Sequence, residues 1–239
     1  MMKLPQQRCL VALLCAMGLG SWATSSFADV QYKFSGFGTL GAAVTNNNDT
    51  AFRTSVDQYK GATKTPSLDA DTKLAVQGAA TLDDVFGVTA QVLGSKRGAD
   101  DFDVNFEWLY AQYTGVTGLD VKAGRVVLPA FLISDSRLVG YASPWLRVSP
   151  LVYAMMPLTR VDGGQVTYRQ TIGSAVASAQ LTRGSGSGLA SNTQHLGGPY
   201  YSFGTSNNVT DHIVGLNGSI EWGDWTLRAS QVTDRKSVV

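Results

Sequence analysis

Short segments in which apolar and polar residues alternate recur along most of this chain, and they constrain its fold more than any other feature. In the first segment one face carries Tyr32, Phe34, Gly36, Gly38, Leu40, Ala42 and Val44. Alternation with a period of two residues is typical of a β-strand with one apolar face. The pattern predicts nine strands, near residues 31–44, 70–81, 87–97, 102–114, 119–127, 162–171, 173–183, 210–221 and 225–234.

The apolar faces of these segments are rich in glycine and alanine and contain few large aliphatic residues. In the fourth segment the alternation places Val104, Phe106, Trp108 and Tyr110 on one face, with Asn105 and Glu107 opposite. The core of a soluble β-sandwich would usually contain more Ile, Leu and Val. The composition instead favours a sheet whose apolar face meets lipid and whose polar face meets water.

The N-terminus is organised like a secretory signal peptide. Lys3 and Arg8 precede an apolar run of about ten residues, and Ser26 and Ala28 are small residues at the −3 and −1 positions of a cleavage site. The run is too short for a membrane-spanning helix, which takes about 20 residues. We interpret residues 1–28 as a signal peptide and 29–239 as the mature β domain. A buried N-terminal helix is the alternative.

Cleavage after Ala28 would change both the cysteine content and the charge. Cys9 and Cys15 leave with the signal peptide, so the exported domain would not depend on disulfides for its stability. The 19 basic residues fall to 17, against 18 acidic residues. A balance this close to neutral indicates neither nucleic-acid binding nor disorder.

The connections between the predicted strands alternate between short and long. The even-numbered connections are tight turns, at Asp83-Asp84, Gly115 to Gly118, Gly173 and Gly223-Asp224. Three of the odd-numbered ones are long, at 46–69, 128–161 and the glycine-rich 184–209, and the one at 98–101 is short. Outer-membrane barrels have short periplasmic turns and longer extracellular loops. Since only helices and closed barrels satisfy every backbone group in lipid, the pattern predicts an all-β, antiparallel up-and-down transmembrane β-barrel.

Several short motifs resemble the porins of Gram-negative bacteria, over roughly residues 31 to 183. They are FSGFGTL at 34–40, AGRVVLP at 123–129, ISDSR at 133–137, VGY at 139–141 and VDG at 161–163. The similarity is greatest to uncharacterised porin-like proteins with a Gly-Phe-Gly segment in the first strand. It implies an outer-membrane location, a homotrimer in contact with lipid, and no cofactor or nucleic-acid partner. It also implies that the chain forms nine strands of a barrel of about 16 to 18.

In such porins the long loop after the fifth strand folds into the barrel and narrows the pore, and here that loop is 128–161. The resemblance therefore implies a pore constriction made by Asp135, Arg137, Arg147, Arg160 and Arg125. General porins tend to set an acidic loop against a basic wall. This loop has more arginine than carboxylate, which argues against cation selectivity. The alternative is that these charges form salt bridges that only brace the barrel.

Arg125 is the candidate on the wall. It shares the parity of Val121 and Ala123, so it faces the lumen only if Gly124 introduces a bulge or the strand ends there.

The end of the chain departs from the porin pattern. A ninth strand is followed by a charged, non-aromatic end, whereas single-chain bacterial barrels have an even number of strands. We therefore expect the first and ninth strands to be unpaired along their outer edges, and this chain alone to form no closed, heat-modifiable barrel. A complete eight-stranded barrel with an extra tail is the alternative.

No catalytic or metal-binding constellation stands out. His195 and His212 are isolated, with no cysteine or paired histidine near them in the sequence. The prediction is a non-enzymatic channel for passive diffusion of small hydrophilic solutes and ions, and the alternative is a surface-exposed structural or adhesive β protein. Aromatic residues near strand ends favour an interfacial girdle, with sugar stacking as the alternative, at Trp108, Tyr110, Tyr113, Trp222 and Trp225.

We expect the exported protein to begin at Asp29, because Ser26 and Ala28 present the small side chains that signal peptidase accepts. Intact-mass and N-terminal peptide mass spectrometry of the exported protein measures this. Retention of Met1 would contradict the prediction.

Overall fold

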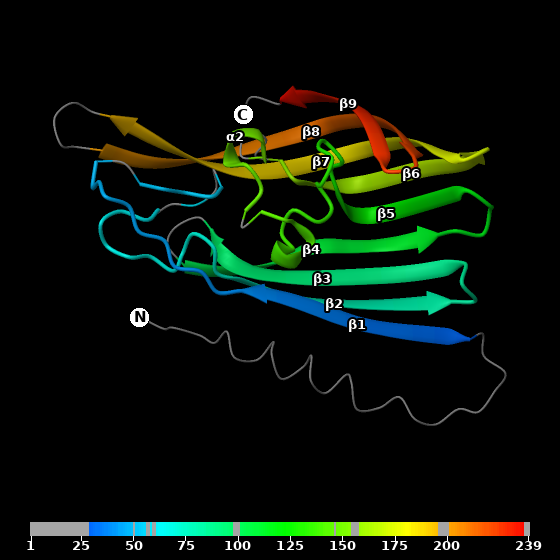
Figure 1. Cartoon of the computed structure of the whole chain (residues 1–239), viewed down its shortest axis with the longest axis horizontal. Coiled ribbons are helices and arrows are strands. Elements are labelled where there is room, and N and C mark those ends of the chain that lie inside the picture. The colour runs from blue at the N-terminus through cyan, green and yellow to red at the C-terminus, as the bar shows by residue number, and fades with distance from the viewer. Residues whose placement is uncertain are drawn as a thin grey trace, which may run out of the picture.

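Nine antiparallel strands make a single sheet in which each strand pairs with the next along the chain (Figure 1). In this computed structural model they are β1 (Val30–Thr39), β2 (Lys73–Leu82), β3 (Phe86–Arg97), β4 (Asp101–Tyr113), β5 (Leu119–Val127), β6 (Arg160–Ile172), β7 (Ala175–His195), β8 (Tyr201–Trp222) and β9 (Trp225–Lys236). The all-β antiparallel prediction and its nine strands are confirmed.

The structure describes residues 29–49, 51–55, 58, 61–97, 101–145, 147–153, 158–195 and 201–236. The predicted signal peptide lies outside them. Helical structure in the described part is confined to a 3-10 turn η1 (Gly140–Ala142) and a short helix α2 (Pro150–Tyr153), both between β5 and β6. None of the described helices is long and apolar enough to cross a membrane.

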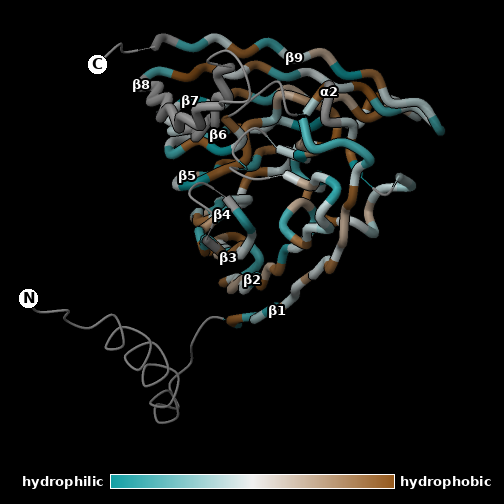
Figure 2. Tube along the Cα trace, turned by 90° about the vertical axis from the view of Figure 1, so that its left-hand side faces the viewer, coloured by the Kyte–Doolittle hydropathy of each residue, from teal (hydrophilic) through white to brown (hydrophobic). Residues whose placement is uncertain are grey.

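The sheet curves into an arc. Viewed along the strands, it runs from β1 at one end of the arc to β9 at the other (Figure 2). Among the described strands β1 pairs only with β2, and β9 only with β8, as expected for their outer edges. The arc gives the sheet a convex and a concave face.

One face of the sheet exposes large apolar side chains. Phe34 is 79% exposed and, through the strand register, lies in one row with Gly78 and Ala90. Other exposed side chains of this face are Tyr32, Leu74, Val76, Phe86, Val88, Val104, Phe106, Val166, Leu181, Leu216, Ile220, Trp222, Trp225 and Leu227. Leaving one such side chain in water forgoes about 1.5–3 kcal/mol of burial free energy. A continuous surface of them is typical of a face that meets lipid.

The opposite face is polar, and its side chains bond across neighbouring strands. Each bond joins residues that are direct register partners, so both side chains lie on the same face. The pairs are Gln91 to Gln77 (2.9 Å), Gln165 to Thr182 (3.2 Å) and Ser178 with Ser219 (2.7 Å). A polar face of this kind is typical of a barrel interior.

A β-bulge in β4 changes the face on which its second half lies. Phe106 pairs with Val92 but Trp108 pairs with Gln91, so Glu107 is an extra residue in β4. Beyond the bulge, Tyr110 is paired with the buried, inward Thr89. The prediction that Val104, Phe106, Trp108 and Tyr110 share one apolar face is therefore wrong for the last two, because one inserted residue inverts the parity.

The other predicted girdle residues lie on the apolar face near the short turns. Trp222 pairs with Trp225, and both are exposed, at 63% and 75%. Tyr113 pairs with Phe86, and the centroids of their rings are 5.0 Å apart.

The four tight turns are confirmed, and they depend on backbone conformations with positive φ. Asp83 and Asp84 have φ of 50° and 56°, and Gly173 and Gly223 have φ of 60° and 55°. The connections at 173–174 and 223–224 are two-residue hairpin turns, which favour such values because their twist matches that of the flanking strands, and the β2–β3 connection has three residues, 83–85.

The seventh connection differs from the prediction. Instead of a long glycine-rich loop at 184–209, β7 and β8 continue as a paired ribbon out to His195 and Tyr201 (Figure 1). The Gly-Ser sequence indicated flexibility, but antiparallel pairing satisfies the backbone groups of such a segment without large side chains. The long connections that remain are β1–β2 and β5–β6.

We expect Val76→Arg to destabilise the protein in a lipid bilayer by about 2–4 kcal/mol, because Val76 is 58% exposed on the apolar face near the middle of β2. Gln77→Arg, one residue along and on the polar face, is the matched control and should cost less than half as much. The measurement is urea unfolding of the protein inserted in liposomes. Equal losses for the two variants would contradict the assignment of the faces.

Candidate functional site

The loop between β5 and β6 leaves and rejoins the wall through one apolar cluster. Leu128 at its start and Leu158 near its end are 2% and 8% exposed and pack with Val126, Val161 and Ile213. Where they meet, the backbone N–H of Leu128 donates to the carbonyl oxygen of Thr159 at 3.0 Å. The two ends of this loop, which spans residues 128–159, are therefore fixed against the inner side of the sheet.

Glycines make room for this base. A Cβ on Gly163 would lie 2.1 Å from the carbonyl oxygen of Arg183, so the backbones of β6 and β7 approach too closely there for any other residue. A Cβ on Gly215 of β8 would lie 3.4 Å from Leu128 Cδ1. The loop therefore packs where small glycines alternate with the wall side chains of the apolar cluster.

Polar side chains of β8 and β9 bind the first turn of the loop. Arg228 donates from Nη1 to the carbonyl oxygen of Leu132 at 3.1 Å and from Nη2 to that of Pro129 at 3.4 Å. Asn217 also donates to the Pro129 carbonyl, at 3.3 Å. Arg228 and Asn217 are register partners of Ser219 and Ser230 on the polar face. The loop therefore lies across the concave face of the sheet.

Glu107, the bulge residue of β4, binds the loop from the other side. Its side chain is 2% exposed, and its two carboxylate oxygens accept from Arg137 Nη2 at 3.4 Å and from Arg160 Nη1 at 3.0 Å. Arg137 belongs to the loop and Arg160 begins β6. One buried carboxylate thus joins the loop to two strands of the wall.

Arg125 lies beside this group but stays on its predicted parity. The β5 register is continuous through Gly124, whose φ is +129°, and Arg125 pairs directly with Leu109 and Asp162. It donates to both carboxylate oxygens of Asp162, at 2.6 and 2.8 Å, and to the carbonyl oxygen of Phe106 at 3.3 Å. Its guanidinium therefore links β4, β5 and β6 at the end of the β4–β5 pairing.

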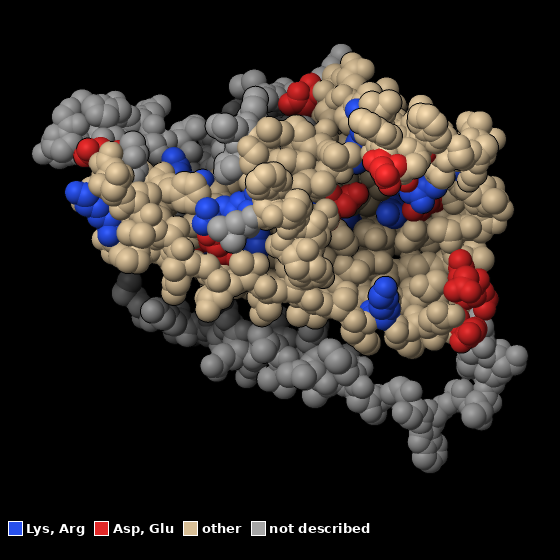
Figure 3. Space-filling model, viewed as in Figure 1, with Lys and Arg blue, Asp and Glu red and all other residues tan. Residues whose placement is uncertain are grey.

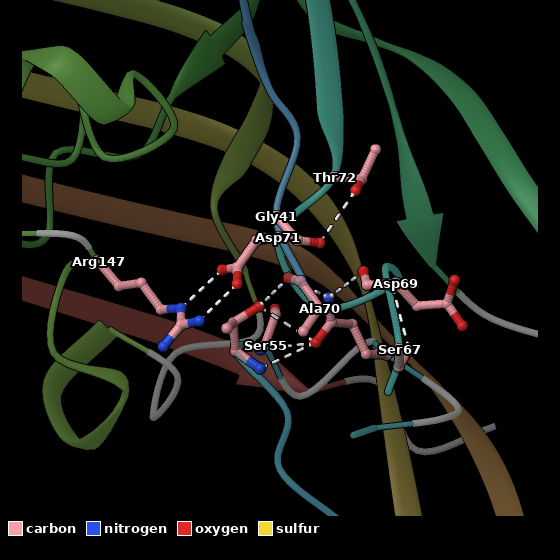
Figure 4. A network of polar contacts seen from close by, with 10 residues as sticks. Gly41, Ser55, Ser67, Asp69, Ala70, Asp71, Thr72 and Arg147 are labelled. Carbon is pink, nitrogen blue, oxygen red and sulfur yellow. Dashed lines mark hydrogen bonds and ion pairs between the residues drawn. The ribbon is translucent and has the colours of Figure 1, made fainter. Parts of the chain in front are cut away.

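A second anchor joins the far part of the loop to the β1–β2 connection (Figure 4). Arg147 donates from Nε and Nη2 to the two oxygens of Asp71, at 2.7 and 2.6 Å, and its guanidinium lies 5.0 Å from the centre of the Phe52 ring. The bonds to Asp71 raise the pKa of Arg147 above its usual value, with burial opposing them. Arg147 therefore remains charged at any working pH.

The β1–β2 connection is itself held together by polar contacts. Gln58, 7% exposed, donates to the carbonyl oxygen of Ala70 at 3.0 Å, next to Asp71. Phe52 and Ala62 exchange backbone hydrogen bonds of 2.8 Å. Asp71 is thus presented to Arg147 by a folded segment.

The structure brings together only some of the residues predicted from the sequence. Arg137 and Arg160 meet at Glu107, with Arg125 next to them, whereas Arg147 lies at the separate anchor. Asp135 is exposed, and no bond of its carboxylate is found in the described part of the chain. On the face shown in Figure 3 some charged side chains lie in groups where both signs occur together, and others stand apart from the opposite sign.

The sequence reasoning missed the acidic partners, which are Glu107, Asp71 and Asp162. Glu107 was placed on the polar side of its strand, but nothing in the sequence paired it with a residue 30 positions away. Asp71 is separated from Arg147 by 76 residues and Asp162 from Arg125 by 37. The loop arginines Arg137 and Arg147 thus face carboxylates, one in the wall at Glu107 and one in the β1–β2 connection at Asp71.

The up-and-down order, the apolar outer face and the polar concave face together define a chain of the outer-membrane β-barrel kind. No protein-family model and no curated protein sequence matches it. Two solved structures match, both of OmpT, an outer membrane protein of Vibrio cholerae.

The first of these structures is in-vitro folded OmpT in its trimer form, with a TM-score of 0.38, 12% identity, and coverage of 87% of this chain and 67% of that chain. The second is OmpT with its loop L8 deleted, with a TM-score of 0.36, 12% identity, and coverage of 87% and 70%. At this level of similarity the class rests on the sheet itself.

The comparison corrects one prediction from the sequence. The expectation that the chain is not an enzyme is withdrawn, because it rested on an absence in the sequence and the two solved structures, both of OmpT, do not support it. Within the described residues no group of three or more His, Cys, Asp or Glu side chains is placed to hold a metal ion.

The Arg147–Asp71 contact predicts a measurable coupling between the two connections. In a double-mutant cycle of Arg147→Ala and Asp71→Ala we expect a coupling of about 1–3 kcal/mol in the free energy of unfolding, since both hydrogen bonds are charge-assisted and the pair is largely shielded from water. Arg147→Lys should lose most of this coupling, because an ammonium cannot make the two parallel bonds. A coupling within 0.3 kcal/mol of zero, about the error expected for independent sites, would contradict the prediction.

Proposed function

We propose that this chain forms the wall and the constriction of a water-filled channel for passive diffusion of small hydrophilic solutes and ions. One observation supports this above the others. The loop 128–159 lies across the polar concave face and is bound there at several separate points, at Glu107, at Asp71 and at Arg228 with Asn217. A loop bound at these points would narrow the space on the concave side of the sheet. It would not fill that space with an apolar core.

The chemistry of that space suits small polar solutes. Its wall presents glutamine, serine and threonine side chains, and its charges occur as arginine–carboxylate pairs. Arg137 and Arg160 share Glu107, and Arg147 binds Asp71. Arg125 and Asp162, in contrast, stay in the register of the apolar face and are not counted among the charges of this space. Size and a modest electrostatic preference would then set selectivity.

The proposal includes the surroundings expected from the sequence. The apolar outer face would contact outer-membrane lipid, and the protein would be exported through the periplasm and assemble as a homotrimer. The competing proposal is a non-channel structural or adhesive β protein, in which the same ion pairs only brace the sheet. Ion pairs of this kind are often structural, so conductance has to decide between the two.

In planar bilayers we expect a full-length homologue, in which further strands close the barrel, to give reproducible conductance steps, and Arg147→Gln in it to shift the cation-to-anion permeability ratio at least twofold toward cations. The variant removes one positive charge beside Asp71 without adding a carboxylate. Arg137→Gln should shift the ratio in the same direction. Reversal potential under a salt gradient measures both.

The control is Asp84→Asn, which removes a charge in the tight β2–β3 turn, where asparagine tolerates the positive φ. It should change the ratio by less than half as much. Conductance with unchanged selectivity in both arginine variants would leave the loop only a bracing role. Absence of conductance from the folded, closed barrel of the full-length homologue would overturn the channel proposal.

A further inference from the structure

We propose that Glu107 is the positioning residue of the constriction, which sets both the place of the loop and the charge of the passage beside it. This inference rests on the channel function proposed above. It goes beyond that proposal because it adds a buried wall carboxylate to the charges that set selectivity and makes that carboxylate the group that positions the loop.

The first argument is the interrupted pairing of the wall at this place. β4 has 13 residues, but its pairing with β5 covers only Leu109–Tyr113, opposite Val121–Arg125. The bulge residue Glu107 and the Phe106 carbonyl lie in β4 just before Leu109, where this pairing begins. The Phe106 carbonyl accepts a hydrogen bond from Arg125. Where the ladder stops, the Arg125 side chain therefore bonds a backbone carbonyl, and side chains of β4, β5 and β6 are joined by ion pairs.

The second argument is the direction that the bulge gives to Glu107. A bulge re-aims one side chain and leaves it outside the alternation of its strand. Here the extra residue is the one that reaches both Arg137 in the loop and Arg160 at the start of β6. A strand in regular alternation would not bring one carboxylate between the loop and the end of a strand two positions along the sheet.

The third argument is charge. Glu107 is 2% exposed, while Arg137 and Arg160 are 15% and 21% exposed and so remain in contact with solvent. The carboxylate lies on the buried side of this group, and the two guanidinium groups lie on its solvent-accessible side. Interactions between partly desolvated charges are several times stronger than the roughly 1 kcal/mol of a pair about 4 Å apart in water. Loss of the buried negative charge would make the net charge of this group one unit more positive beside the passage.

The experiment compares Glu107→Gln with Glu107→Asp and with Asp103→Asn. Glutamine keeps the shape of glutamate and removes its charge, and aspartate keeps the charge on a shorter side chain. Asp103 is exposed on the same strand and belongs to none of the loop anchors, so it is the matched control. Reversal potential is measured at about 0.1 M and about 1 M salt, where screening lengths are about 10 Å and 3 Å.

We expect Glu107→Gln to shift the permeability ratio at least threefold toward anions at low salt, and less than half as much at high salt. Glu107→Asp should keep the wild-type sign of selectivity. Asp103→Asn should shift the ratio by less than half of the Glu107→Gln effect. Equal shifts for Glu107→Gln and Asp103→Asn would overturn the assignment of selectivity to Glu107.

A second readout isolates the position of the loop and does not depend on conductance. Ser134 is 7% exposed in the loop, and a Ser134→Cys variant provides one cysteine outside positions 9 and 15 for labelling with a maleimide. In the Glu107→Gln background the labelling rate should rise at least tenfold, because the loop has lost its bond to the wall. An unchanged rate would overturn the positioning role, even if selectivity shifts. If wild-type protein gives no conductance, the channel proposal fails, and the labelling result still decides whether Glu107 holds the loop.

Discussion

Hydrogen bonding between neighbouring strands is the constraint on which the rest of this structure depends. In lipid every backbone donor and acceptor has to be satisfied within the protein, and here each strand does so with the next along the chain. Where the ladder between β4 and β5 stops, the Arg125 guanidinium takes over part of this task at the Phe106 carbonyl. The ionic group around Glu107 stands at that limit, so the same place that completes the wall also holds the loop.

The strand pattern was predictable because it reflects a surface, not a set of contacts. Alternate residues such as Phe34 and Leu216 lie on the apolar face of the sheet whichever residues they pair with. A period of two is therefore visible in the sequence alone. The tight turns were predictable for a related reason, since positive φ limits the residue types at positions such as Gly173. All nine strands and the four short turns follow from these two local rules.

The bulge and the ion pairs were not predictable in this way. The extra residue in β4 can be recognised only from how β4 pairs with β3. In the sequence, the alternation of β4 continues through Glu107 without interruption. The extra residue inverted the faces assigned to Trp108 and Tyr110. Arg137 and Arg147 were recognised as charged loop residues, but their carboxylate partners depend on how distant strands are arranged in space. Arg125 kept the parity that the sequence indicated, and only the structure showed that Asp162 pairs with it.

The paired ribbon of β7 and β8 extends beyond the ends of the remaining strands. Beyond the register shift at Gly184 to Gly186 the two strands stay paired as far as His195 and Tyr201, and at about 3.3 Å per residue this is roughly 30 Å of additional length. A membrane's apolar layer takes up only the lower part of such a hairpin. The paired ends of the ribbon, at His195 and Tyr201, would therefore stand well clear of the lipid headgroups.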